Sequence, residues 1–424
     1  MTAYWAARAV LPGGVATGVV LDCDGEGRLA AVRTGCERPP PSVSTLGGLV
    51  VPGLVDSHSH AFHRALRGRA GGGDFWAWRS AMYALVDRLD PDSLRALATA
   101  AFAELVEAGV STVHEFHYLH RPAGMDDAIC EAARRAGIRL VLLDTCYLRA
   151  GFDGAALDPV QQRFCDGNVE RWAARADDLA ARHPDVLVGA AIHSVRAVDP
   201  PSMTAVADWA GARAVPLHLH LSEQPAENAA CLAATGRTPA QLAHDRAVLG
   251  PSTTAVHCTH LAGADIELLG ATRTTACLCP TTERDLADGI GPAAALRGAG
   301  CPLRLGSDSH AVVDLFEEAR AMEMDERLAT GRRGHHRPEE LLAAATAGAA
   351  LRPGEPADLC AVRIDGSRWA GVDPDDPLPM LVAAGSTGDV SDVVVAGRHV
   401  VRHGRHLSID VASELRAAIA AVAG

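Results

Sequence analysis

"GLVVPGLVDSHSHAFHRALRGR" occupies residues 48–69, where an apolar run passes directly into a segment with three histidines. In an extended strand, residues two apart point to the same face, so His58 and His60 can direct both imidazoles toward one point. Two histidines at a strand end could equally be ordinary surface residues. The pair indicates a metal site only if other strands bring further ligands to the same place.

Further apolar runs, many of them β-branched, recur between residues 50 and 350, separated by Ala/Leu-rich segments with charges at helical spacing. This alternation indicates βαβ units and a parallel sheet. Eight such runs favour an α/β fold of the (β/α)8 TIM-barrel type over an open doubly wound sheet. The expected strands are 48–55, 110–118, 138–147, 186–195, 215–223, 253–261, 273–281 and 301–310.

The two ends of the chain differ in character from the segment between them. Residues 1–49 contain short strand-like runs split by Gly and Asp, and similar runs recur in residues 352–424. We therefore expect both ends to pair in one small β-sandwich domain, beside a metal-dependent barrel over residues 50–351. The clusters "ERPPPS" and "LRPGEPAD" are suitable boundaries because Pro and Gly interrupt regular structure.

Composition limits the classes of partner. The 424 residues are 48% hydrophobic and 21% charged, which is ordinary for a globular chain. A formal net charge of -13 disfavours nucleic acid and anionic membranes, so local arginines must meet any anionic ligand. We expect a small-molecule substrate and a homodimer.

Cysteine usage and the first residues indicate the compartment. The 11 cysteines include no CxxC pair, which indicates reduced thiols in the cytoplasm. The first residues lack a basic region followed by a long apolar stretch, and no apolar run of about 18 residues occurs. We therefore expect a cytoplasmic protein that is neither exported nor membrane-spanning.

Histidines and carboxylates also stand at the ends of other expected strands. His220 lies in "HLHLSE", His257 in "VHCTH" and Asp308 in "GSDSH". Because barrel active sites lie at the C-terminal strand ends, these side chains should converge. Imidazoles from His58, His60 and His220 with the carboxylate of Asp308 suit one divalent ion. Zinc is expected, with iron or manganese as alternatives.

The motifs "HSH", "HLHLSE", "VHCTH" and "GSDSH" together resemble those of the amidohydrolase superfamily. No lysine ends the fourth expected strand, so the chain is similar to the branch that binds one metal ion rather than two. Within that branch, "HSHAFHRALRG", "FWAWRSAMY", "HEFHYLH", "HSVRAV" and "CPTTERDLADG" resemble the formimidoylglutamate deiminases over essentially the whole chain. The resemblance implies hydrolysis of N-formimidoyl-L-glutamate to N-formyl-L-glutamate and ammonia, in histidine degradation.

The resemblance also implies roles for individual residues. The metal ligands would be His58, His60, His220 and Asp308. Zinc lowers the pKa of bound water to roughly 7, which makes hydroxide available for attack on the formimidoyl carbon. Asp308 would accept a proton from the water, Glu223 would protonate the departing nitrogen, and His257 would orient the attacking oxygen.

Five further residues would meet the substrate: His63, Arg79, Tyr118, His193 and Arg196. Relatives commonly have glutamine where this chain has His63, although both side chains can form hydrogen bonds. Arginine suits a substrate with two carboxylates because guanidinium binds a carboxylate bidentately. Arg79 lies beside tryptophans, where arginine often only packs its stem.

Two other functions stay open at this point. A related deaminase acting on a guanine- or cytosine-type heterocycle would use the same metal and proton-transfer groups, but it would not need arginines that bind carboxylates. A non-catalytic metal-binding barrel would need neither Glu223 nor His257. The three histidines of "HEFHYLH", which are His114, His117 and His120, are expected to be structural or to support residues that line the site.

Overall fold

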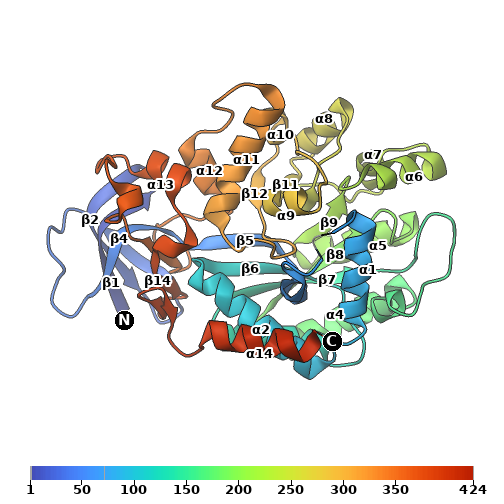
Figure 1. Cartoon of the computed structure of the whole chain (residues 1–424), viewed down its shortest axis with the longest axis horizontal. Helices are drawn as coiled ribbons and strands as arrows, with labels where there is room; N and C mark the ends of the chain where they lie inside the picture. The colour runs from blue at the N-terminus through green and yellow to red at the C-terminus, as the bar shows by residue number, and fades with distance from the viewer. Residues whose placement is uncertain (1, 71, 424) are drawn as a thin grey trace.

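The computed structural model describes residues 2–70 and 72–423, which form two eight-stranded sheets (Figure 1). The barrel sheet runs β12-β11-β10-β9-β8-β7-β6-β5, with parallel neighbours throughout. A bridge between Ser59 and Asp308 joins its two outer strands, so the ring is nearly closed. The expected α/β barrel is therefore confirmed. Its strands are β5 (Leu54–Ser59), β6 (Val110–His117), β7 (Arg139–Cys146), β8 (Leu187–Ser194), β9 (Leu217–Leu221), β10 (Thr253–His257), β11 (Thr275–Leu278) and β12 (Leu303–Leu305).

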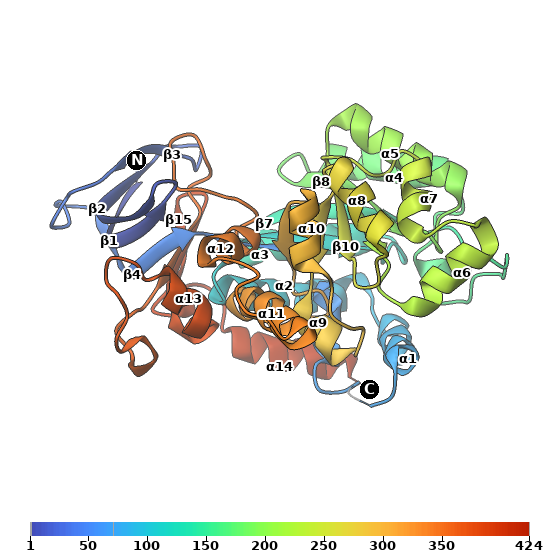
Figure 2. The ribbon, with the colours of Figure 1, turned by 90° about the horizontal axis from the view of Figure 1, so that it is seen from above.

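Helices cover the outside of the barrel (Figure 2). Local sequence explains where they begin: Asp90 accepts a hydrogen bond from the Ser93 amide, and Pro91 takes the first helical position of α2. Of the helices described, none is long and apolar enough to cross a membrane. The helices are α2 (Pro91–Glu107), α3 (Met125–Ala136), α4 (Val169–Arg182), α5 (Pro200–Arg213), α6 (Pro225–Thr235), α7 (Pro239–Asp245), α8 (Gly263–Ala271), α9 (Pro280–Asp285), α10 (Ala293–Ala299), α11 (Leu315–Thr330) and α12 (Pro338–Ala345).

Two connections of the barrel carry additional helices. The 3-10 helix η1 (Ala61–Leu66) and the helix α1 (Phe75–Val86) lie between β5 and α2, and η2 (Gln161–Arg163) precedes α4. Asp74 caps α1 by accepting hydrogen bonds from the amides of Trp76 and Ala77. These segments follow strands at their C-terminal ends, where a barrel places its active site.

The second sheet runs β16-β15-β14-β13-β4-β1-β2-β3, and both ends of the chain contribute strands to it, as expected. It is one continuous sheet around an apolar cluster that includes Tyr4, Leu21 and Leu359. Its strands are β1 (Thr2–Leu11), β2 (Gly14–Cys23), β3 (Leu29–Arg33), β4 (Ser44–Pro52), β13 (Leu359–Val362), β14 (Val390–Val395), β15 (Arg398–Arg402) and β16 (Arg405–His406). The C-terminal region also forms η3 (Ser367–Trp369), α13 (Leu378–Ala384), η4 (Thr387–Asp389) and α14 (Val411–Val422).

The expectation that residues 48–55 form one barrel strand is wrong. β4 ends at Pro52 in the small sheet and β5 starts at Leu54 in the barrel, with Gly53 packed too closely against Ser111 to leave room for a Cβ. The expected boundary between residues 49 and 50 thus falls within β4, and we propose Gly53 as the division. We also propose that α14 belongs to the barrel, because it packs along α2 (Figure 1).

Gly306 allows the last barrel strand to approach the first. A Cβ on Gly306 would lie 2.6 Å from the carbonyl oxygen of His58 and 2.7 Å from its Cβ. Two backbone hydrogen bonds form beside this contact: the Asp308 amide donates to His58 (2.9 Å) and the His60 amide donates to Asp308 (3.1 Å). The small side chain of Gly306 therefore permits the contact that closes the barrel.

We predict that Gly306→Ala lowers the free energy of unfolding by about 1 to 3 kcal/mol, because the new methyl group overpacks the β5–β12 contact. Urea denaturation measures this change. Gly298→Ala is the matched control, since nothing lies within 4 Å of a Cβ there and the residue is exposed in α10. Equal stability of the two variants would show that the contact has room to relax.

Candidate active site

A cavity of about 190 Å³ opens among the C-terminal strand ends and α1. Every site residue predicted from the sequence lines it except His58, which is fully buried beside Asp308. The structure therefore brings together side chains from distant parts of the chain. The predicted residues on its walls are His60, His63, Arg79, Tyr118, His193, Arg196, His220, Glu223, His257 and Asp308.

Two groups of possible ligands share His58. Nε2 of His58 lies 3.2 Å from Oδ1 of Asp308, and Nε2 of His60 lies 3.4 Å from the same oxygen, so these three residues are close enough to hold one ion. Nε2 of His220 lies 3.2 Å from Nε2 of His58 and groups with His58 and His257. Ligand atoms around a tetrahedral zinc ion stand about 3.3 Å apart, given bonds of about 2.0 to 2.1 Å. The three contacts fit that spacing, and His220 meets the predicted set through His58.

The protonation of the rings fits the same interpretation. Nδ1 of His60 donates to the Phe116 carbonyl and Nδ1 of His220 donates to the His193 carbonyl, both at 2.8 Å. Each bond leaves the lone pair of Nε2 directed into the cluster, which is how protein carbonyls orient metal-binding imidazoles. Burial lowers the pKa of His58, His60 and His220, so neutral rings, which bind metals, are favoured.

Two buried carboxylates that sequence reasoning missed hold the ligand-bearing backbone. Asp56 accepts hydrogen bonds from the amide (2.9 Å) and hydroxyl (2.5 Å) of Ser307, which joins β5 to the end of β12. Glu115 accepts from the Ser59 hydroxyl (2.7 Å) and the Ala61 amide (2.8 Å), which joins β5 to β6. Burial raises the pKa of Asp56 to about 7 and that of Glu115 to about 8.

Backbone strain concentrates at the same strand ends. Asp308 has φ 45°, His257 has φ 70° and Ser222, between a ligand and Glu223, has φ 53°. Non-glycine residues occupy this left-handed region at a cost, and they do so most often at functional sites. This backbone conformation lets the side chains of Asp308, His257 and Glu223 reach the cavity.

Glu223 and His257 lie next to the ligand cluster and to each other, with Nε2 of His257 3.7 Å from Oε1 of Glu223. Burial raises the pKa of Glu223 to about 8, which keeps a proton on it near neutral pH. On the other side, Nδ1 of His257 lies 3.6 Å from Glu283, whose carboxylate accepts a hydrogen bond from the Cys279 amide (2.9 Å). Burial alone would lower the pKa of His257, but Glu223 and Glu283 raise it.

Glu283 is a third carboxylate that sequence reasoning missed. It lies within "CPTTERDLADG", a motif that resembles known relatives but does not itself mark which acid faces the site. Its carboxylate orients the ring that faces Glu223, so a carboxylate shortly after a strand end was the available signal.

His63 does not face water, as a loop histidine would. Its side chain is buried, and its Nε2 lies 2.9 Å from the hydroxyl of Tyr118. Burial lowers the pKa of His63 to about 3, so the ring is neutral, and burial raises the pKa of Tyr118. The pair presents neutral hydrogen-bonding groups beside the ligand cluster.

Arg79 and Arg196 present guanidinium groups to the cavity. Arg79 donates to the hydroxyl of Tyr83 from Nε (3.0 Å) and Nη2 (2.6 Å). Arg196 donates to the Ala150 carbonyl (2.8 Å) and to the Tyr147 hydroxyl (3.4 Å). In the described part of the chain no carboxylate lies within ion-pair distance of either guanidinium, so both retain donors for a ligand. The buried carboxyl of Glu227 also lines the cavity; Tyr147 and Glu227 raise the pKa of Arg196 against the effect of burial.

Comparison with known proteins places this site in a family. The model of the amidohydrolase family matches residues 49–400. The chain belongs to the amidohydrolase family. It is similar to the formimidoylglutamate deiminase of Pseudomonas aeruginosa, at 35% identity over 96% of each chain, and to the 8-oxoguanine deaminase of that species, at 32% identity over 82% of this chain and 81% of the relative.

A solved structure extends the likeness to three dimensions. The crystal structure of an amidohydrolase from Brucella melitensis superposes with a TM-score of 0.92 at 29% identity and covers 100% of both chains. The family and the named relatives support a hydrolase that acts as a deaminase, and the relatives differ in substrate.

We predict that His220→Ala abolishes turnover and removes bound metal, because His220 supplies one of the converging lone pairs. Elemental analysis of the purified protein measures the metal. His244→Ala, an exposed histidine on α7, is the control and should bind metal as the parent does. Undiminished metal in His220→Ala would remove this residue from the ligand set.

Proposed function

We propose that the chain hydrolyses N-formimidoyl-L-glutamate to N-formyl-L-glutamate and ammonia, a step of histidine degradation. The observation that carries the proposal is the presence of Arg79 and Arg196 in one cavity with the ligand cluster. This substrate has two carboxylates, and guanidinium is the group best shaped to bind them. The similarity to the Pseudomonas formimidoylglutamate deiminase supports the same substrate.

The proposal includes one divalent ion, and zinc suits the donor set best. It would be held by His58, His60, His220 and Asp308. When bound, zinc supplies Lewis acidity that lowers the pKa of water to about 7. Every ring in the set is favoured in the neutral form that such binding requires.

In the proposed mechanism the two carboxylates divide the proton transfers. Burial raises the pKa of Asp308, but the neighbouring His58, His257 and His60 outweigh this effect and lower it, so the carboxylate is ionised. Asp308 can therefore accept a proton from the attacking water but retains it weakly. Glu223, with its raised pKa, retains a proton near neutral pH and delivers it to the imino nitrogen as the water oxygen adds to the formimidoyl carbon. The proton taken up by Asp308 then completes the departing ammonia, and the hydroxyl proton of the diamino intermediate returns Glu223 to its acid form.

His257 stands between these steps. Its ring lies between Glu223 and Glu283, and the carboxylates of Glu283 and Asp308 favour its protonated form while Glu223 carries its own proton. A protonated imidazole in this place orients the attacking oxygen and stabilises the negative charge that develops on it. We propose that His63, Tyr118 and His193 complete the contacts with the substrate.

A second candidate is deamination of a guanine- or cytosine-type heterocycle. It is favoured by the aromatic walls of the cavity, which include Trp78, Tyr147 and Phe164, and by the similarity to 8-oxoguanine deaminase. Ammonia release from a panel of formimidoyl amino acids and nucleobases separates the two functions. Selective release from formimidoylglutamate supports the proposal, and selective release from a nucleobase contradicts it.

We predict that Glu223→Gln retains metal but lowers kcat by about 100- to 10,000-fold, because an amide cannot deliver a proton. In the parent enzyme the acid form of Glu223 is needed. Its pKa of about 8 therefore predicts full kcat below pH 8 and a decline as the pH rises through that value. Steady-state kinetics across the pH range measure both effects. Near-normal turnover by Glu223→Gln would exclude this role.

We predict that Arg196→Met lowers kcat/KM for formimidoylglutamate by about 2 to 4 kcal/mol of transition-state binding, with metal content unchanged. The loss should be specific to a substrate with carboxylates, so kcat/KM for formamidine should stay near the parent value. Arg171→Met, an exposed arginine of α4, serves as the control. If Arg196→Met hydrolyses formimidoylglutamate with the kcat/KM of the parent, Arg196 does not bind a substrate carboxylate, and a heterocycle becomes the better-supported substrate.

A further inference from the structure

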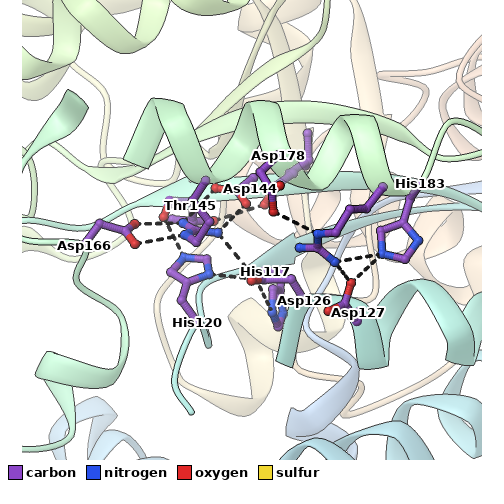
Figure 3. A network of polar contacts seen from close by, with 12 residues as sticks. His117, His120, Asp126, Asp127, Asp144, Thr145, Asp166, Asp178 and His183 are labelled. Carbon is purple, nitrogen blue, oxygen red and sulfur yellow. Dashed lines mark hydrogen bonds and ion pairs between the residues drawn. The ribbon is translucent and has the colours of Figure 1, made fainter. Parts of the chain in front are cut away.

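A second cluster of titratable side chains surrounds the segment after β6 (Figure 3). His117 and His120 flank Tyr118, which lines the cavity, and Asp126 belongs to the first turn of α3. Thr145 lies near the end of β7, two residues before Tyr147, another cavity residue. The cluster thus joins segments that reach the cavity without containing a metal ligand of the active site.

His120 is held at both ring nitrogens. Nδ1 lies 2.9 Å from Oδ1 of Asp126, and Nε2 lies 2.9 Å from the carbonyl oxygen of Thr145 (Figure 3). Both partners are acceptors, whereas a neutral imidazole has only one N–H. The two hydrogen bonds form together only when the ring carries two protons.

The partner of Nδ1 is an ionised carboxylate. Oδ1 of Asp126 also lies 3.2 Å from Nε2 of His117 and 3.5 Å from Nη1 of Arg175. Although burial raises the pKa of Asp126, His120 and His117 hold it well below its usual range, so its carboxylate can only accept a hydrogen bond from His120. Burial lowers the pKa of His117. Arg175 in turn pairs with Asp144 (2.5 Å) and Asp166 (2.8 Å), so three carboxylates surround one guanidinium. The charged or titratable groups of the network are His117, His120, Asp126, Asp144, Asp166 and Arg175.

The same network extends to the helix that carries Arg79. The backbone amide of His120 donates to the Arg163 carbonyl (3.0 Å). The guanidinium of Arg163 donates to the Arg121 carbonyl (2.9 Å) and to the Leu89 carbonyl (2.5 Å), three residues beyond the end of α1. Movement of the segment around His120 would therefore shift Tyr118 relative to α1.

We propose that His120 is a positioning residue for substrate recognition: its doubly protonated ring clamps the segment bearing Tyr118 to the end of β7 bearing Tyr147. This inference rests on the proposed function, since Tyr118 contacts the substrate and Tyr147 contacts Arg196. Loss of a ring proton releases one of the two bonds. Substrate binding should then weaken as the pH rises, while the ligand cluster and Glu223, which the clamp does not touch, continue to support turnover.

A metal ion is the competing occupant of this cluster, because His117, His120 and Asp126 together present ligand atoms close enough to hold one. Two contacts favour protons instead. The Arg175 guanidinium already approaches the carboxylate oxygen that a cation would need, and the ligand set lacks a fourth side chain from the described residues. Metal content therefore separates the two interpretations.

The experiment compares the parent, His120→Ala and His120→Gln, with His183→Ala as the matched control. Nε2 of His183 lies 2.6 Å from a carboxylate oxygen of Asp127 in the neighbouring part of the network (Figure 3). We expect His120→Ala to raise KM for formimidoylglutamate by about 10- to 100-fold, as misplacement of binding groups does, with kcat within about threefold. Metal content and kcat/KM for formamidine should not change.

His120→Gln covers the case in which His120→Ala fails to fold. Glutamine is neutral at every pH, so its KM should be raised and should not increase further at alkaline pH as the parent KM does. An unchanged KM in the variants, an equal effect in His183→Ala, or loss of one metal equivalent each overturns the inference. Nitrogen-15 NMR of the His120 ring tests its double protonation independently of activity, and a neutral ring at pH 7 overturns the clamp. Absence of turnover of formimidoylglutamate, by contrast, overturns only the proposed substrate.

Discussion

The approach of the first and last barrel strands is the contact on which the rest of the site depends. Asp56 at the end of β5 accepts two hydrogen bonds from Ser307, and Gly306 leaves the space for them. The same contact brings His58 to 3.2 Å from Asp308, although 250 residues separate them in the chain. The candidate metal site and barrel closure thus share one set of backbone contacts.

Burial and neighbouring carboxylates have opposite effects on the protonation of the site histidines. Around the candidate ligands burial favours neutral imidazoles, because among the described residues Asp308 is the one carboxylate that pairs with the rings of His58 and His60, and it does not offset desolvation. At His257 two further carboxylates reverse that preference. Histidines that look alike in the sequence therefore differ in charge according to the number of acids that the fold places beside them.

Periodicity was sufficient to predict the barrel, because eight apolar runs alternate with helical segments. The positions of His58, His60 and Asp308 at strand ends were sufficient to predict that these side chains lie close together. Periodicity failed at residues 48–55, where two strands of different sheets follow each other with only Gly53 between them. The apolar character of a run does not indicate which of two sheets its residues join. The resemblance to known enzymes, rather than spacing, led to Arg79, since nothing in its local sequence indicates that α1 covers the cavity.

Asp56, Glu115 and Glu283 escaped prediction for a different reason. Each acts by accepting hydrogen bonds from a segment distant in sequence or by orienting a ring, and neither role has a spacing of its own. Such residues become visible only when backbone amides of other strands are in place.

The order of strands in the small sheet has a consequence for the nascent chain. β4 pairs with β13, so one edge of β4 lacks its partner until residues Leu359–Val362 have left the ribosome. Unpaired strand edges are templates for intermolecular pairing, and contacts between such distant segments form slowly. The barrel must therefore be synthesised almost entirely before the small sheet is complete, which leaves the free edge of β4 open to mispairing during translation.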